Sequence, residues 1–420
     1  MVKLSFISVK LSKALLVLLL LAVLSLAAFS CVAPSSGGGC AGPGAQGWSG
    51  FASYDGILYL GSMDGKVLAL NPSARSERLM FPSERDGEWV LRLKAPAPSG
   101  GMCGPLGCAP AARPVAIYGM PAVAADLVCV ATYVGDGGKV MAINRFAPGY
   151  DEEGNPSWKK QGEWVYPRGQ DSFIGAVVGS PVVVEDTLYV GSSDGKVYAL
   201  DAVYGDKRWE FDTGAKIWTS PAVKNGVLYV ANYEDKLYAL SDQDGSVVWE
   251  RELPASLASS PVVSDDTVFF GTFDRYLLAI DSGDGSDRWR FPKDNPADNW
   301  FWAAPVVRDN VVYAGCLDHS IYALEASTGR KLWQFVADSP IVSTPVLVDG
   351  LLVAISDSGE MYVLRADSGV SERTVSIGYS VMAPLYAEED MVYVHARDGG
   401  VYCIDVQTGL IAWEFSSIID

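Results

Sequence analysis

The sequence of 420 residues is poor in histidine, with only His319 and His395. It also lacks a cysteine–histidine cluster with the spacing of zinc ligands, a nucleophile elbow and a glycine-rich phosphate loop. His319 falls in a turn and His395 in a strand, and neither has a neighbouring ligand in the sequence. We therefore expect surface or packed histidines, no catalytic residue and no metal site.

Positive charge is also scarce. The chain has 32 Lys and Arg against 50 Asp and Glu, and its net charge is −18. A surface this acidic repels phosphate backbones, so the composition excludes nucleic acid as a partner. Acidic turns such as residues 281–287 weakly suggest calcium, but the same residues are favoured in turns for backbone reasons.

One long hydrophobic run is present, at residues 14–29, after three lysines and before Cys31. Small residues precede Cys31, as at the processing site of a bacterial lipoprotein, and this predicts a lipoprotein-type signal peptide over 1–30. Cys31 would then carry a lipid that anchors the protein to a membrane outside the cytoplasm. An uncleaved anchor helix and plain secretion remain alternatives. Residues 31–47 are rich in Gly, Ser and Pro and predict a flexible tether.

A repeat of about forty residues fills the remainder, 48–420. Each unit begins with a proline-led apolar run and continues with a β-branched strand, an Asp/Gly turn and a third strand. The leading prolines are Pro121, Pro181, Pro221, Pro261, Pro305, Pro345 and Pro384. Segments of this length are strands. Eight such units predict an all-β fold, an eight-bladed β-propeller of four-stranded antiparallel blades, rather than a solenoid with open edges.

A second pattern, A-x-D-x-x-x-G-x-x-x-W, closes each unit, as in Ala199, Asp201, Gly205 and Trp209. The glycine allows a positive φ in the turn, and the small residue is expected to leave room for a tryptophan from the neighbouring blade. Five tryptophans at one repeat position are typical of structural contacts between blades. They are Trp209, Trp249, Trp289, Trp333 and Trp413.

These units resemble the PQQ-type repeats of the quinoprotein alcohol dehydrogenase-like superfamily. The resemblance covers residues 50–415 and implies the fold, but it leaves two functions open. Some members are PQQ-dependent alcohol or sugar dehydrogenases that bind calcium. Others are cofactor-free scaffolds, such as the propeller lipoprotein of the outer-membrane assembly machinery. The lipoprotein-like leader favours an envelope scaffold that is a monomer within a complex of envelope proteins and needs no cofactor. A carbohydrate-binding propeller is a third possibility.

The cysteines support the scaffold alternative. Cys103 and Cys108 lie in a Gly- and Pro-rich stretch outside the repeat and are candidates for a disulfide in an oxidising compartment. The resemblance implies an adjacent cysteine pair over the quinone in the true dehydrogenases, and this chain has none. Cys129, Cys316 and Cys403 fall on strands and predict buried thiols.

Departures from the repeat are candidates for function. The seventh unit has Arg373 in place of the tryptophan, which predicts a loosely packed blade. Extra residues at 82–120, 145–163 and 292–303 predict surface loops. Aromatic and apolar residues gather in the segments that precede the prolines, which predicts a partner-binding or ligand-binding face around the channel mouth. These residues are Phe173, Ile174, Trp218, Trp300, Phe301, Trp302 and Tyr379.

Overall fold

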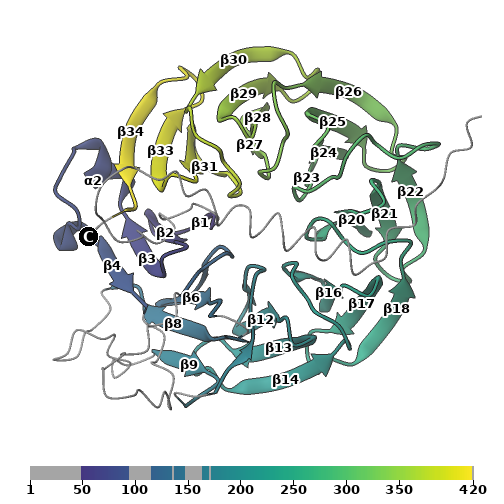
Figure 1. Ribbon diagram of the computed structural model, residues 1–420, viewed down its shortest axis with the longest axis horizontal. Helices are drawn as coiled ribbons and strands as arrows, with labels where there is room; N and C mark the ends of the chain where they lie inside the picture. The colour runs from purple at the N-terminus through teal and green to yellow at the C-terminus, as the bar shows by residue number, and fades with distance from the viewer. Residues whose placement is uncertain (1–48, 94–114, 135–136, 147–162, 170–171, 419–420) are drawn as a thin grey trace, which may run out of the picture. The chain divides into compact units, whose positions relative to one another are not determined.

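The computed structural model describes residues 49–93, 115–134, 137–146, 163–169 and 172–418. Residues 45–420 form one compact unit, in which eight four-stranded antiparallel sheets follow one another around a ring (Figure 1). The predicted eight-bladed propeller is therefore confirmed. Among the described residues, no helix has the length and apolar character needed to cross a membrane.

The blades follow the order of the chain. The first blade comprises β1 (Phe51–Tyr54), β2 (Ile57–Gly61), β3 (Lys66–Leu70) and β4 (Trp89–Arg92). The second comprises β5 (Ala122–Ala124), β6 (Leu127–Ala131), β8 (Val140–Asn144) and β9 (Trp164–Tyr166). The third comprises β11 (Val182–Val184), β12 (Thr187–Gly191), β13 (Lys196–Asp201) and β14 (Lys207–Asp212). The fourth comprises β15 (Ala222–Lys224), β16 (Val227–Ala231), β17 (Lys236–Ser241) and β18 (Val247–Glu252).

The remaining four blades repeat this plan. The fifth comprises β19 (Val262–Ser264), β20 (Thr267–Gly271), β21 (Leu277–Asp281) and β22 (Asp287–Phe291). The sixth comprises β23 (Val306–Arg308), β24 (Val311–Gly315), β25 (Ser320–Glu325) and β26 (Lys331–Val336). The seventh comprises β27 (Val346–Val348), β28 (Leu351–Ile355), β29 (Glu360–Arg365) and β30 (Ser371–Ser376). The eighth comprises β31 (Tyr386–Glu388), β32 (Met391–His395), β33 (Gly400–Asp405) and β34 (Ile411–Ser416). A small sheet pairs β7 (Gly137–Gly138) with β10 (Ile174–Gly175).

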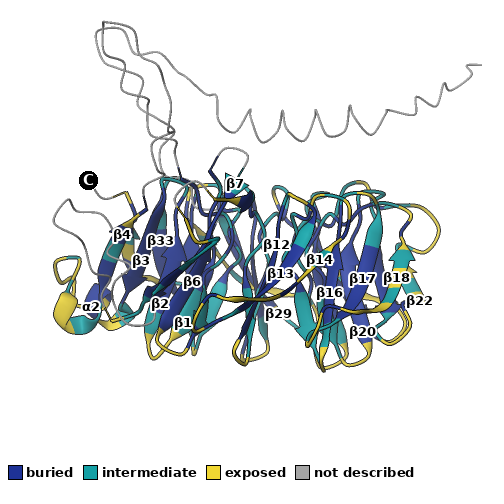
Figure 2. Ribbon diagram, turned by 90° about the horizontal axis from the view of Figure 1, so that it is seen from below, coloured by how far each residue is buried: buried dark blue, intermediate teal, exposed yellow. Residues whose placement is uncertain are grey.

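Burial follows the position of a strand within its blade. The second and third strands are almost entirely buried, because a neighbouring blade covers each of their faces. The fourth strand lies at the outer rim and alternates between exposed and half-buried residues, as in β18. Figure 2 shows this as a dark interior between exposed turns at the two ends of the blades. Eight hydrophobic clusters hold the ring together, and each joins two neighbouring blades.

Tryptophan contacts link the blades at the repeat position. The Nε1 atom of Trp209 donates to the carbonyl oxygen of Asp242 in the next blade at 3.0 Å, and the hydroxyl of Tyr189 donates to the same oxygen at 3.1 Å. Gly245 lies under the indole, where a Cβ atom would come within 2.6 Å of the ring. The contact therefore requires glycine at position 245. The same arrangement places Trp249 over Gly285, Trp289 over Gly329 and Trp333 over Gly369.

The roles within the motif differ in one respect from the expectation. Ala199 lies opposite Trp209 of its own blade, so the small residue makes room for that tryptophan and not for a neighbour's. Asp201 supports the turn by accepting the backbone N–H groups of Val203 and Tyr204 at 2.9 and 2.8 Å. Burial opposes the ionisation of Asp201, but the hydrogen bond and charge of Arg208 and the two backbone N–H groups together outweigh burial and lower the pKa of Asp201.

Two further tryptophans occupy this position, and the motif search missed them. Trp89 donates to the carbonyl of Arg145 at 2.8 Å, and Trp164 donates to the carbonyl of Ala202 at 3.1 Å. Trp89 belongs to β4, so part of the predicted 82–120 insertion is in fact the outer strand of the first blade. The shared string Gly-Glu-Trp-Val at 87–90 and 162–165 was the available signal.

Arg373 replaces the tryptophan in the seventh blade and keeps its contacts. Its guanidinium donates to the carbonyl of Val406, the counterpart of the carbonyl that Trp333 reaches in the blade before. The Cδ atom of Arg373 would lie 3.2 Å from a Cβ at Gly409, so the stem covers that glycine. An arginine supplies both a flat donor and an apolar stem, so the seventh blade keeps the hydrogen bond to its neighbour. Its stem leaves more room over Gly409, at 3.2 Å, than Trp333 leaves over Gly369, at 2.6 Å.

The ring closes where the eighth blade meets the first. Each of these blades is built from its own consecutive strands, so side chains alone join them. Trp413 packs in one cluster with residues of the first blade, including Leu58 and Leu68. A short helix, α2 (Pro72–Ser76), and a 3-10 turn, η1 (Glu84–Asp86), stand between β3 and β4 on this seam. This insertion between β3 and β4 packs against the last blade, where the ring of Phe81 lies 4.7 Å from that of Phe415.

A buried ion pair holds this insertion in shape. Glu88 is 1% exposed and accepts two hydrogen bonds from Arg75, at 2.7 and 2.6 Å. It also accepts the backbone N–H groups of Asn71 and Ser83, each at 3.0 Å. Arg75 in turn lies 5.5 Å from the ring of Phe415 on β34. The pair thus connects the first blade to the last.

His395 lies buried on the same seam, at 1% exposure. Its Nδ1 atom is 2.9 Å from the carbonyl oxygen of Ser49, and since a carbonyl only accepts, Nδ1 carries the proton. Nε2 is buried without a hydrogen-bond partner among the described residues. Burial lowers the pKa of His395, although Ser49, Asp398 and Asp64 act in the opposite direction.

This arrangement predicts a pH-dependent stability. Because the pKa of His395 is lower in the folded than in the unfolded chain, the unfolded chain binds the extra proton as the pH falls below about 6.5. We expect the midpoint of thermal unfolding to decrease as the pH is lowered from about 7 to about 5. This interval lies above the range in which most carboxylates titrate. Thermal unfolding of His395→Gln should show a smaller decrease over this interval. The control is His319→Gln, at the other histidine, and an equal decrease in both variants would contradict the assignment.

Candidate partner-binding surface

The two sides of the ring carry different segments. We call one side the proline face. It bears the segments that precede the blade prolines and the hairpins between the second and third strands. Backbone hydrogen bonds hold these two kinds of segment together, as from Tyr233 to Lys216 and from Leu317 to Trp300, each at 2.9 Å. The other side, the turn face, bears the remaining turns of each blade. The predicted partner-face residues before the prolines therefore lie at or near the proline face.

Five aromatic residues of the fourth to sixth blades form a continuous surface there, which we call the aromatic arc. The arc consists of Trp218, Tyr233, Phe273, Trp300 and Trp302, all half-buried. Its ring centroids are 4.7 Å apart for Trp218 and Tyr233 and 6.1 Å apart for Tyr233 and Phe273. Phe273 also contacts Trp300 at 5.4 Å and Trp302 at 6.5 Å. The predicted residues Trp218, Trp300 and Trp302 are thus connected through Tyr233 and Phe273, which were not predicted.

Hydrogen bonds fix the arc to the blades. Nε1 of Trp300 donates to the carbonyl of Phe273 at 3.1 Å, which joins the segment before the sixth blade to the hairpin of the fifth. The backbone N–H of Phe273 donates to the carbonyl of Ser256 at 3.0 Å. The rings are therefore held in place before any partner arrives, which reduces the entropy lost on binding.

The other predicted residues do not join the arc. Phe301 is 0% exposed and packs against Phe291 and Tyr322, and Ile174 is 6% exposed. The prediction that these two face a partner was wrong, since they fill the interior below the face. Phe173 is 40% exposed and lies under Nζ of Lys139, on the small sheet beside the second blade. Tyr379 is 49% exposed and lies at the junction of the seventh and eighth blades.

Tyr233 and Phe273 could have been found in the sequence. They occupy the hairpin position at which the third blade has Ser193, in an otherwise polar turn. An aromatic residue in a polar turn departs from the repeat in the same way as Trp300 and Trp302 do.

The rings of the arc are tilted with respect to one another. The interplanar angles are 58° for Trp218 and Tyr233, 53° for Tyr233 and Phe273, and 89° for Phe273 and Trp300. Edge-to-face packing of this kind leaves an uneven apolar surface and no flat platform. Such a surface can accommodate interdigitating side chains.

The turn face is acidic. The turns between the first and second strands place exposed carboxylates at residues with positive φ, among them Asp55, Glu185, Asp265, Asp349 and Glu389. Such positions suit the tight two-residue hairpin turn, so backbone geometry accounts for part of this pattern. The result is a field that repels anions on this side.

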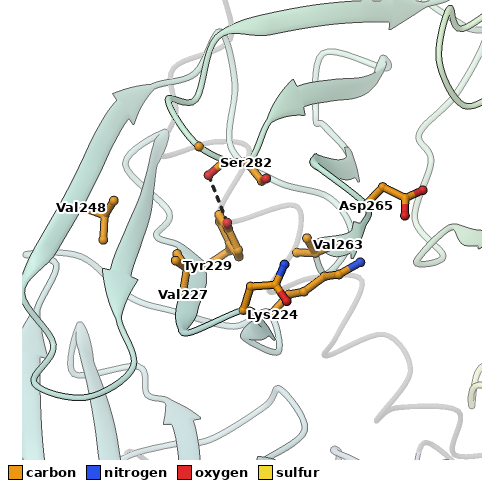
Figure 3. A pocket seen from close by; sticks show the side chains of 9 residues that line it. Lys224, Val227, Tyr229, Val248, Val263, Asp265 and Ser282 are labelled. Carbon is orange, nitrogen blue, oxygen red and sulfur yellow. Dashed lines mark hydrogen bonds between the residues drawn. The ribbon is translucent and has the colours of Figure 1, made fainter.

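A small hollow of about 160 Å³ lies on the turn face between the fourth and fifth blades (Figure 3). Lys224, Val248 and Asp265 are among its lining residues, and the hydroxyl of Tyr229 closes one side by donating to the carbonyl of Ser282 at 3.0 Å. Pockets for cofactor-sized ligands are about 300 Å³ or larger. This hollow is too small for such a ligand.

The cysteines divide into two groups. Cys129, Cys316 and Cys403 are buried and free. Burial raises the pKa of Cys129 and of Cys403 to about 12, and raises that of Cys316 as well. These thiols stay protonated and unreactive at neutral pH. Cys31, Cys40, Cys103 and Cys108 lie outside the described residues, so the lipidation and disulfide predictions stay predictions.

No group of three or more His, Cys, Asp or Glu side chains that could hold a metal ion occurs among the residues with described positions. A calcium-bound quinone would need such a group of oxygen ligands beside two stacking surfaces.

Eight four-stranded blades, joined by tryptophans or an arginine at one repeat position, define a β-propeller of PQQ-type repeats. The family model described as outer membrane protein assembly factor BamB matches residues 41–216 and 205–415. The chain belongs to this family.

Two solved structures show the same fold. BamB from Moraxella catarrhalis is 24% identical with a TM-score of 0.50, and the match covers 56% of this chain and 71% of that one. The computationally designed Ika8 protein is 15% identical with a TM-score of 0.61, over 86% of this chain and 96% of that one. No curated protein matches the chain. Because both identities are below 25%, these two comparisons support a shared fold and nothing further.

Proposed function

We propose that the protein is a non-catalytic scaffold of the cell envelope, which binds other proteins through the aromatic arc during the assembly of outer-membrane proteins. The arc carries this proposal. Its five rings occupy positions that the blade motif does not require, and they form one fixed, half-exposed apolar surface. Surfaces of this composition are typical of protein interfaces. Membership of the BamB family supports a role in the envelope.

The proposal includes a lipid anchor on Cys31. The hydrophobic run at 14–29 and the small residues before Cys31 support it. In cell fractionation, the wild-type chain should be found with membranes, and Cys31→Ala should be found in the soluble fraction or as an unprocessed precursor. Wild-type protein that stays soluble and takes up no labelled fatty acid would contradict the anchor.

Capture of envelope proteins tests the arc itself. The test variant combines Trp218→Ala with Trp302→Ala and leaves Trp300 in place, because the indole of Trp300 also ties two backbone segments together. We expect this variant to recover at least about tenfold less of the envelope proteins that the wild type captures, since aromatic residues at the centre of an interface carry much of its energy. Quantitative mass spectrometry after affinity purification measures the loss.

Tyr379→Ala is the matched control, because it removes an exposed aromatic residue outside the arc. It should capture the same proteins as the wild type. If the arc variant captures as much envelope protein as the wild type, the binding surface lies elsewhere. A different result would favour the dehydrogenase alternative over the scaffold. It is saturable, calcium-dependent quenching of tryptophan fluorescence by pyrroloquinoline quinone.

A further inference from the structure

Several aromatic rings outside the arc are covered by cations of the same chain. Nζ of Lys139 lies 5.0 Å from the ring of Phe173. The guanidinium of Arg145 lies 4.8 Å from the ring of Tyr54 and 4.1 Å from that of Phe146. A cation over a ring face is attracted by the negative charge of its π-system. Tyr54, Phe146 and Phe173 thus receive a positive partner from within the chain.

The arc has no such partner. Among the described residues, no lysine or arginine lies over a ring of Trp218, Tyr233, Phe273, Trp300 or Trp302. The one arginine of the neighbouring hairpin, Arg275, donates instead to the carbonyl of Asp298 at 3.4 Å. No cation of the described chain therefore covers these partly exposed rings.

Acidic residues outnumber basic residues around the arc. The acidic residues are Glu234, Asp235, Asp274, Asp294, Asp298 and Asp318. The basic residues are Lys216, Arg275 and Lys293. Asp235, Asp274 and Asp318 accept hydrogen bonds from hydroxyl groups of the chain. Glu234, Asp294 and Asp298 are exposed and make no ion pair with any described residue. Together with the net charge of −18, this rim attracts positive charge.

We infer that the occupant of the arc is a segment of another protein that presents aromatic or aliphatic side chains next to arginine or lysine. The apolar side chains contact the tilted rings, and the cations lie over the open ring faces and beside the exposed carboxylates. Because the arc crosses three blades, the segment binds in an extended form. This inference rests on the proposed function and specifies the chemistry of its partner.

Binding of synthetic peptides to the full mature chain tests the inference. Three labelled peptides of equal length share two phenylalanines and differ in their flanking residues, which are arginine, glutamine or aspartate. In fluorescence anisotropy, we expect the arginine peptide to bind at least about tenfold more tightly than the aspartate peptide. Its affinity should fall as salt is added, because exposed charges are screened. The glutamine peptide should lie between the two.

The variants identify the surface. The double variant with Trp218→Ala and Trp302→Ala should lose about tenfold or more of its affinity for the arginine peptide, whereas Tyr379→Ala should retain it. Equal affinity for the arginine and aspartate peptides would overturn the inference, as would unchanged binding by the arc variant. If envelope proteins are captured through the arc while the peptides show no preference for arginine, the inference fails and the proposed function stands. If the arc captures no envelope protein, the proposed function fails as well.

Discussion

Trp209→Ala is expected to lower the free energy of unfolding by about 3–5 kcal/mol, the range for emptying a buried aromatic site. Trp209 is buried, lies over Gly245 and donates to the carbonyl of Asp242 at 3.0 Å. Its removal opens a cavity at the junction of the third and fourth blades and leaves Tyr189 as the remaining donor to that carbonyl. Equilibrium unfolding in urea measures the change.

Arg373→Ala provides the comparison at the same repeat position. It removes one hydrogen bond to the carbonyl of Val406 and the packing of the stem over Gly409. We expect a loss of about 1–2 kcal/mol, smaller than for the tryptophan because less apolar surface is buried. Tyr204→Ala, at a residue that is 68% exposed, should cost about 0.5 kcal/mol or less. Equal losses for Trp209 and Tyr204 would show that the tryptophan contacts do not hold the blades together.

Glu88→Ala is expected to destabilise the ring by about 3–5 kcal/mol, because it leaves the buried Arg75 without its counter-ion. Arg75 and Glu88 have side chains that are 7% and 0% exposed, and their closest atoms are 2.6 Å apart. The loss also frees the backbone N–H groups of Asn71 and Ser83, and it loosens the insertion that packs against β34. Hydrogen exchange should show that protection falls most in the first and eighth blades.

Asp367→Ala is the control for this pair. Asp367 and Arg365 form an ion pair at 3.3 Å with both side chains more than half exposed. Exposed pairs contribute about 0–1 kcal/mol, because water and salt screen them. Similar losses in the two variants would mean that the buried pair at the seam has no special role in closing the ring.

Much of the fold follows from local patterns that recur along the chain. Proline-led strands, Asp/Gly turns and a glycine four residues before a tryptophan are each set by backbone geometry, which acts over a few residues. Their recurrence predicts the eight blades, and the structure shows them. The same reading missed Trp89 and Trp164, because insertions separate these residues from the rest of their motif.

The candidate site was predicted only in part. Trp218, Trp300 and Trp302 depart from the repeat and were recognised for that reason. Periodicity could not show that Phe301, between two residues of the arc, points into the interior and is 0% exposed. It also could not show that Phe273 contacts three other aromatic residues, because these contacts join hairpins to segments of other blades.

By itself, the sequence determined the number and type of blades and the position of most blade contacts, because these depend on interactions within one repeat. Only the tertiary structure decided how Arg373 replaces a tryptophan, how Arg75, Glu88 and His395 close the ring, and which aromatic residues form one surface. These features depend on which side chains of different blades come within a few ångströms of each other. The curvature of the closed ring fixes those distances, and no single repeat encodes them.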